Sequence, residues 1–286
     1  KLILMVGVLG VSASAILVRF SQAPSGVTAA YRLGWTVLLL LPVVLLRCRA
    51  ELRRVTARDL VLCGASGVLL ALHFLTWFES LKRTSVASST VLVSTEVIFT
   101  ALGFALFLHG KIPRLGVWAI LLAFGGSALL ALSGGGGAGE LSGNLLALAA
   151  ASAAAVYTLI GRIQRGHLST TVYTFLTYLA CFLTLLLGTA AAGTPLTGYG
   201  GREWLIGLAL AVLCTLLGHS LFSWCLKYLS PSYVSAAKLC EPVFSSLAAI
   251  PLFGEVPGPL QLAGGAAVLG AVLLYTWAER EKTPAG

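Results

Sequence analysis

Ten long apolar blocks, separated by short segments that hold proline, glycine or charged residues, make up most of this sequence. A helix that crosses the hydrocarbon core of a bilayer needs about 20 mostly apolar residues. The blocks span residues 2–18, 27–46, 60–81, 86–108, 115–132, 145–160, 172–192, 204–226, 233–253 and 260–277. We therefore predict an all-α integral membrane protein with ten transmembrane helices and the lipid bilayer as a partner.

The charge content excludes an ordinary soluble protein. Only 10% of the residues are charged, whereas soluble domains average about 25%. The net charge of +9 does not indicate a nucleic-acid partner, because the basic residues lie between the apolar blocks, as they do in membrane proteins. The six cysteines lack metal-ligand spacing, so we expect neither a metal site nor a cofactor.

Lysine and arginine are unevenly distributed over the connections between the blocks. If the N-terminus is cytoplasmic, the cytoplasmic segments hold 13 of the 19 basic residues and the outer loops hold four. Cytoplasmic loops are enriched in Lys and Arg. We therefore predict a multi-pass protein of the cytoplasmic (inner) membrane with both termini in the cytoplasm.

A glycine-rich stretch divides the chain into two similar halves. The pair Glu96 and Phe99 recurs as Glu241 and Phe244 at a constant offset of 145 residues. Each half has five predicted helices. Because five is odd, the second half begins on the opposite side of the membrane from the first, and the two halves have inverted orientations. Such inverted repeats, with substrate held at the midplane, are common in secondary transporters, so the repeat favours transport. The predicted segments are a first five-helix repeat at 1–133, a flexible linker at 134–140 and a second five-helix repeat at 141–286.

Motifs in both halves resemble one known family. Residues 77–87, 226–231 (Leu-Lys-Tyr-Leu-Ser-Pro), 241–244 (Glu-Pro-Val-Phe) and 253–255 (Phe-Gly-Glu) are similar to the signature of EamA-type transporters of the drug/metabolite transporter superfamily. The resemblance implies ten helices in two inverted halves around a central cavity. That cavity is lined largely by the third, fourth, eighth and ninth helices, with contributions from the first and sixth. Residues 96–97 (Glu-Val) depart from the family pattern, which often has a proline there, and add a carboxylate to the cavity.

Four strongly charged residues lie inside apolar blocks: Arg32, Glu96, Lys238 and Glu241. Each costs about 2.5–3.5 kcal/mol at the centre of a bilayer, so a compensating role is expected. Glu96, Lys238 and Glu241 are predicted to bind substrate, and Arg32 is predicted as a structural charge. Pairing between helices is the alternative role for these residues. Pro242 removes a backbone donor beside Glu241 and predicts a helix break at mid-depth.

Aromatic and histidine side chains at helical spacing are predicted to form the walls of the substrate site. These residues are His73, Trp77, Phe99, Tyr157 and His219. Packing within the bundle or anchoring at the interface is the alternative role for the aromatic rings. Because histidine titrates near neutral pH, His73 and His219, together with Glu96, are candidates for coupling transport to protons.

These features predict a secondary transporter or facilitator that moves a small-molecule substrate by alternating access and works as a monomer. Both signs of charge beside aromatic walls favour amino acids or related zwitterionic or amphipathic solutes, in the export direction typical of the relatives. An alternative is the transport of organic cations of the quaternary-ammonium type or drugs, held by Glu96 and cation–π contacts. A remote alternative is a rhomboid-like intramembrane serine protease, with Ser66 as nucleophile and His219 as its base.

Overall fold

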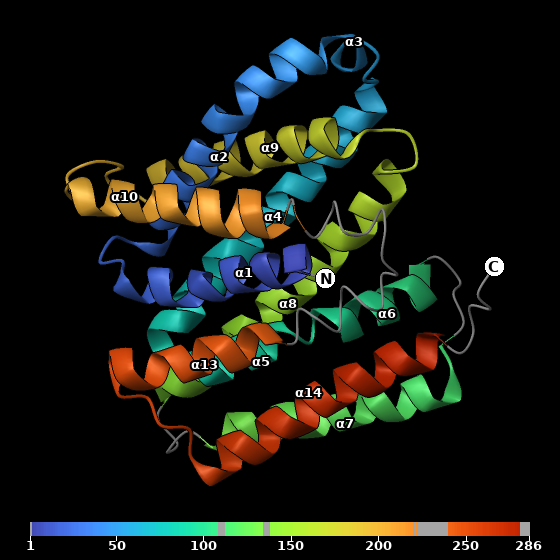
Figure 1. Cartoon of the computed structure of the whole chain (residues 1–286), viewed down its shortest axis with the longest axis vertical. Coiled ribbons are helices and arrows are strands. Elements are labelled where there is room, and N and C mark those ends of the chain that lie inside the picture. The colour runs from blue at the N-terminus through green and yellow to red at the C-terminus, as the bar shows by residue number, and fades with distance from the viewer. Residues whose placement is uncertain (1, 108–111, 134–137, 220, 222–239, 281–286) are drawn as a thin grey trace.

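The computed structural model describes residues 2–107, 112–133, 138–219, 221 and 240–280, and in this part of the chain every regular element is a helix (Figure 1). In chain order the elements are α1 (Leu2–Phe20), α2 (Ser25–Arg47), α3 (Arg49–Leu52), α4 (Ala57–Arg83), α5 (Val86–Val93), α6 (Glu96–Phe107), α7 (Arg114–Ser133), α8 (Ala138–Gln164), α9 (Thr170–Ala191), α10 (Gly201–Ala209), the π-helical segment η1 (Leu210–His219), α13 (Cys240–Phe253) and α14 (Pro259–Arg280). The all-helical fold predicted from the sequence is confirmed for these residues.

Six apolar stretches within these helices are long enough to cross a membrane. They are Ser25–Arg47, Ala57–Arg83, Gly139–Gly161, Thr170–Ala191, Gly201–Gly218 and Pro259–Ala278. Four shorter apolar stretches are Val6–Phe20, Val86–Thr100, Arg114–Leu130 and Cys240–Phe253. Each of the ten overlaps one predicted block. The structure thus agrees with a multi-pass membrane protein, while the count of ten spans stays a prediction because four stretches are short.

Side chains at the helix ends explain where several helices begin. Thr56 accepts a hydrogen bond from the backbone N–H of Asp59, and the Asp59 carboxylate accepts one from the N–H of Thr56, which forms a capping box at the start of α4. The hydroxyls of Ser85 and Ser169 cap α5 and α9 in a similar way. α8 begins at Ala138, so the last three residues of the predicted linker are helical.

The fourth predicted helix is divided into α5 and α6. The turn between them is tight, and the hydroxyls of Ser94 and Thr95 donate to the carbonyls of Thr90 and Leu92 at 2.9 and 2.6 Å. The backbone N–H groups of Ser94 and Thr95 also donate to these two carbonyls, at 3.3 and 3.1 Å, so each hydroxyl adds a second donor. The eighth predicted helix is α-helical in α10 and continues as the π-helical segment η1.

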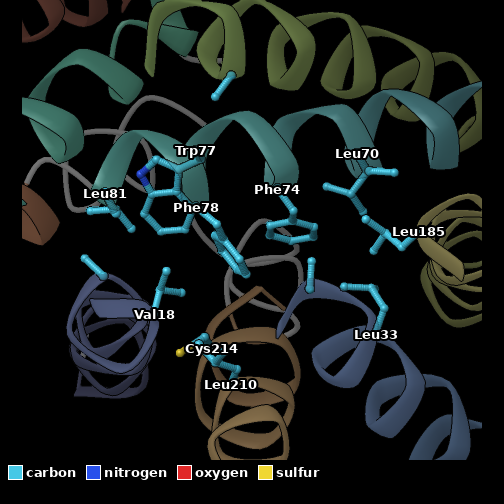
Figure 2. Close-up of a cluster of buried hydrophobic side chains, with 14 of the residues drawn as sticks. Val18, Leu33, Leu70, Phe74, Trp77, Phe78, Leu81, Leu185, Leu210 and Cys214 are labelled. Carbon is cyan, nitrogen blue, oxygen red and sulfur yellow. The ribbon is translucent and has the colours of Figure 1, made fainter. Parts of the chain in front are cut away.

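The bundle joins helices from the beginning and the end of the chain. Figure 1 places α7 beside α14 at one edge of the molecule and α2, α9 and α10 at the opposite edge. Between these edges, α4 packs on α8 and α9, and α1 packs on η1 and α13. Figure 2 shows the main buried cluster, in which Phe74 and Phe78 of α4 face Leu33 of α2 and Leu210 of η1.

One close contact between α4 and α9 depends on a glycine. A Cβ atom at Gly67 would lie 2.5 Å from the Cβ of Ala180 and 2.7 Å from both the backbone nitrogen of Cys181 and the carbonyl oxygen of Thr177. Small residues let membrane helices approach closely in this way. The two backbones can therefore be this close only because Gly67 has no side chain.

Candidate functional site

Arg32 lies fully buried where several helices meet. Its guanidinium donates to the hydroxyl of Thr215 on η1 at 2.9 Å and to that of Ser14 on α1 at 3.1 Å. It also lies 4.3 Å from the centre of the Phe74 ring on α4. We call the region where α1, α2 and α4 meet η1, α8 and α9 the seam. Glu241 of α13 acts on Arg32 electrostatically.

His73 and Trp77 lie together on the face of α4 that packs on α8. Their rings are stacked with centres 5.9 Å apart, and His73 Nδ1 is 3.0 Å from the carbonyl oxygen of Ala150 on α8. The Trp77 ring is 5% exposed, and within the described residues its Nε1 has no hydrogen-bond partner. The structure therefore brings two of the predicted wall residues together and leaves a buried donor at the seam.

Glu96 opens α6 and contacts α8. Its carboxylate accepts a hydrogen bond of 2.8 Å from the hydroxyl of Thr158. Tyr157, the neighbour of Thr158, packs against the main buried cluster and is close enough to Glu96 for an electrostatic effect. Phe99 lies edge-on to Phe124 of α7, with ring centres 6.3 Å apart. Glu96 thus contacts α8 through Thr158, whereas Phe99 contacts α7.

The remaining predicted site residues lie beside or within the stretch 220–239, most of which the structure does not describe. Pro242 is buried near the start of α13, next to Glu241. Lys238 and the side chain of His219 lie outside the described residues, so the predicted pairing of Lys238 with Glu241 stays a prediction.

Ser66 has a structural partner. Its hydroxyl is fully buried and lies 2.8 Å from the hydroxyl of Tyr173 on α9. A serine nucleophile needs a base within hydrogen-bond reach. The observed contact instead joins α4 to α9, close to the Gly67 contact.

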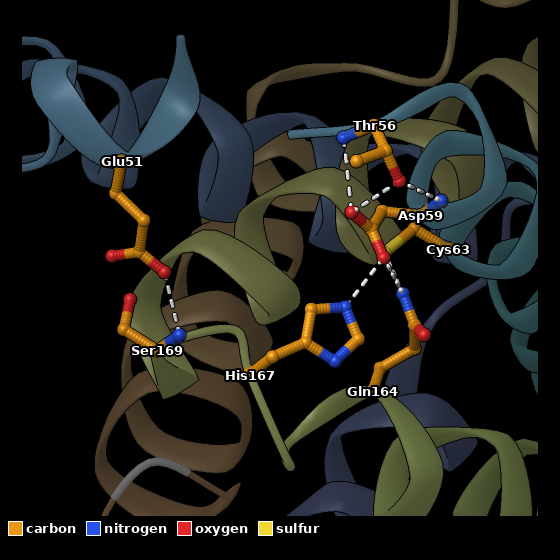
Figure 3. A network of polar contacts seen from close by, with 7 residues as sticks. All are labelled: Glu51, Thr56, Asp59, Cys63, Gln164, His167 and Ser169. Carbon is orange, nitrogen blue, oxygen red and sulfur yellow. Dashed lines mark hydrogen bonds and ion pairs between the residues drawn. The ribbon is translucent and has the colours of Figure 1, made fainter. Parts of the chain in front are cut away.

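A polar network at one end of the bundle was not anticipated from the sequence. Figure 3 shows the Asp59 carboxylate between Thr56, Gln164 and His167. It accepts a hydrogen bond of 3.2 Å from Gln164 Nε2 and contacts His167 Nε2 at 2.6 Å. This network connects the start of α4 to the end of α8. The Thr-x-x-Asp spacing of the capping box was the sequence signal for it, but that spacing does not identify the partners on α8.

A second group of carboxylate contacts lies at the start of α10. Glu203 accepts hydrogen bonds from the Ser21 hydroxyl at 2.6 Å and from the Gln22 backbone N–H at 3.0 Å. It therefore binds the chain that leaves α1, as Asp59 binds the chain that leaves α8. Arg58–Asp59 and Arg202–Glu203 are similar basic–acidic pairs near the starts of α4 and α10, but the sequence does not indicate the partners of the two carboxylates.

Near Glu203, an ion pair joins α1 to the connection between α13 and α14. Arg19 and Glu255 are 2.5 Å apart, and Arg19 also donates to the carbonyl oxygen of Thr84 at 3.0 Å. Glu255 accepts the backbone N–H of Val86 at 2.7 Å. Beside this pair, a recess of about 260 Å³ is lined by Ser85, Ala87, Ser246, Ala249, Gly254, Glu255, Val256, Pro257 and Gln261.

The described residues contain no cluster of three potential metal ligands. The seam instead offers a buried cation, hydroxyls and aromatic rings, and Glu96 of α6 lies against α8, so that these groups can bind an organic solute by hydrogen bonds and charge.

Comparison with known proteins assigns the chain to a family of carriers. The model of the EamA-like transporter family matches residues 2–132 and 141–277. The pseudopaline exporter CntI of Pseudomonas aeruginosa is 24% identical over 207 residues, which cover 72% of each chain. A probable terminal-alkyne amino-acid exporter of Streptantibioticus cattleyicolor is 28% identical over 233 residues, which cover 78% of this chain and 75% of that protein.

One solved crystal structure has the same fold. It superposes with a TM-score of 0.63 at 19% identity and covers 99% of this chain and 98% of its own. Together with the match over both halves, these comparisons confirm the resemblance drawn from the sequence motifs. Both relatives named above carry the names of exporters. The protein belongs to the EamA-like transporter family.

Proposed function

We propose that the protein exports small organic metabolites, most favourably amino acids or related zwitterionic solutes, across the inner membrane by alternating access. The observation that carries this proposal is the seam, where a buried arginine, hydroxyls and aromatic rings from distant parts of the chain meet. The names of the relatives, a pseudopaline exporter and an amino-acid exporter, support the same class of solute and direction.

The neighbours of the helices support two inverted five-helix repeats, 1–133 and 141–286. In the two repeats α1 corresponds to α8, and α4 corresponds to α10 with η1. A repeat therefore predicts that the packing of α4 on α8 recurs as packing of η1 on α1, and both contacts occur. The same exchange maps the α2–α9 and α7–α14 pairs onto themselves, and both of these also occur. The contacts of Asp59 and Glu203 follow the same relation, which inverted repeats require.

The polar contacts also support the proposed topology, in which the connections that hold them share one face of the membrane. With both termini in the cytoplasm, Arg19, Thr84, Glu203 and Glu255 all belong to the outer face, and they lie at one end of the bundle. Cysteines introduced at exposed loop positions test this: Arg53→Cys and Gly166→Cys should react only from the cytoplasm, and Val256→Cys only from outside. Reaction of Arg53→Cys and Gly166→Cys from opposite sides would contradict the inverted arrangement.

In the proposed mechanism, substrate enters the seam and replaces part of its hydration with protein groups. Glu96, Lys238 and Glu241 supply charge, and His73, Trp77, Phe99, Tyr157 and His219 form the walls. Tilting of one half against the other then closes one entrance and opens the other. Glu96, His73 and His219 are the candidates for proton coupling, and the protein is proposed to act as a monomer.

Flux into liposomes tests the substrate class. Purified protein is reconstituted, and uptake of a panel of amino acids is compared with that of quaternary-ammonium compounds. Glu96→Gln is expected to weaken amino-acid transport and to abolish cation transport, because only a carboxylate offsets the charge of a desolvated cation. Glu140→Gln, at the start of α8, is the matched control and should leave both fluxes unchanged. Absence of amino-acid flux in the unmodified protein would refute the proposed substrate.

Export of organic cations is the second candidate function. The observation that favours it is the position of Glu96, whose carboxylate contacts Thr158 of α8, the neighbour of the partly buried Tyr157. A desolvated cation gains about 2 kcal/mol or more from an aromatic face. Flux of quaternary-ammonium compounds without flux of any amino acid would establish this alternative.

A further inference from the structure

The chemistry around Arg32 is unusual for a buried charge. Arg32 is 1% exposed, and α2 contains no acidic residue. Within the described residues, the ion pairs involve Arg19, Arg83 and His167, but not Arg32. Among the described residues, its hydrogen-bond and cation–π partners are two hydroxyls and one aromatic ring, all of them uncharged.

Neutral partners satisfy only part of what a guanidinium needs. It has five N–H donors in a planar fork that matches a carboxylate bidentately. Two of its hydrogen bonds go to the single hydroxyls of Ser14 and Thr215, which do not supply a negative charge. A buried charge without an ionic partner is unfavourable in a membrane protein, and such residues commonly mark substrate pathways.

The partners of Arg32 come from both halves of the chain. Ser14 and Phe74 precede the predicted linker, and Thr215 follows it. Any motion that opens the seam between α1 and η1 therefore moves Thr215 relative to Arg32. Thr215 also lies in the π-helical segment η1, where its hydroxyl donates to the carbonyl oxygen of Leu210 at 3.3 Å. Such irregular turns occur frequently at functional sites.

We propose that Arg32 is the residue that binds the substrate's carboxylate when the seam opens. The inference rests on the proposed function and gives Arg32 a role in specificity in place of the structural role expected from the sequence. A carboxylate replaces the hydroxyl of Thr215 with two charge-assisted hydrogen bonds. Glu241 of α13, predicted from the sequence to bind substrate, is the proposed partner of a substrate's ammonium group. The preferred substrate is therefore a solute with both groups.

Paired substrates separate this role from a structural one. Flux is measured in liposomes for L-phenylalanine and L-leucine and for their carboxamides, which keep the ammonium group and side chain but lack the carboxylate. In Arg32→Gln, flux of the acids should fall roughly tenfold or more, while flux of the carboxamides should be unchanged or higher. Arg83→Gln, at an exposed arginine paired with Glu79, is the matched control and should leave the acid-to-carboxamide ratio unchanged.

A second variant covers the case in which Arg32→Gln does not fold. Arg32→Lys keeps the charge but loses the planar fork, so flux of the acids should fall several-fold while that of the carboxamides stays the same. If the fluxes of acids and carboxamides fall equally in either folded variant, the inference about Arg32 is wrong, while the proposed function is unaffected. Failure of the unmodified protein to transport any amino acid would overturn the proposed function as well.

Discussion

The contact at Gly67 allows the packing of α4 on α9 to be tested quantitatively. Replacement by alanine places a Cβ atom 2.5 Å from the Cβ of Ala180, whereas ordinary contacts begin near 3.4 Å. The two helices must therefore separate by roughly 0.9 Å, because the other close atoms belong to the α9 backbone and have no alternative rotamer. Overpacking of this kind costs about 1–3 kcal/mol.

Gly64, one turn earlier on α4, provides the control, because a Cβ atom there would meet nothing within 4 Å. Alanine in place of either glycine gains roughly 1 kcal/mol of helix propensity. The difference between the two variants therefore isolates the steric contact, and Gly67→Ala should be less stable than Gly64→Ala by about 1–3 kcal/mol. The free energy of unfolding is measured in detergent micelles by titration with a denaturing detergent. Equal stability of the two variants would refute the close contact.

Three carboxylate substitutions test the polar networks with the same titration. Asp59→Asn should lower the free energy of unfolding by about 1–3 kcal/mol, because a buried acceptor loses its charge; an unchanged value would contradict the network. Glu203→Gln should lower it by about 1–2 kcal/mol, since its partners are a hydroxyl and a backbone N–H; a loss as large in the control Glu140→Gln, at the start of α8, would argue against a specific contact. Glu255→Gln should lower it by no more than about 1 kcal/mol, because the ion pair with Arg19 is partly exposed; a larger loss would mean that the pair is more buried than observed.

Much of the helical architecture could be predicted because it follows from local composition. Each apolar block was long enough to require a membrane, and every one of the ten overlaps an apolar helical stretch. The interruptions were harder to predict. The break at Ser94 and Thr95 has no proline, and the π-helical turns of η1 have no distinctive residue pattern.

The candidate site could be predicted only in its charged and aromatic residues. The sequence singled out Arg32 and Glu96 because charge is rare in apolar blocks, and it paired His73 with Trp77 through helical spacing. Their partners could not be predicted, because Ser14, Thr158 and Thr215 are three among many hydroxyls in the chain. Which hydroxyl faces a charge depends on how the helices cross, and that is a property of packing rather than of local sequence.

The tight turn at Ser94 and Thr95 affects how the bundle can change shape. A continuous helix bends as one rod, so displacement of one end is transmitted to the other. Here two hydroxyls already satisfy backbone carbonyls, so further bending at this point exposes few unsatisfied groups to lipid. Both segments pack on α8, and α5 packs on α13 as well. The two segments can therefore tilt by different amounts, because α5 is also held by α13.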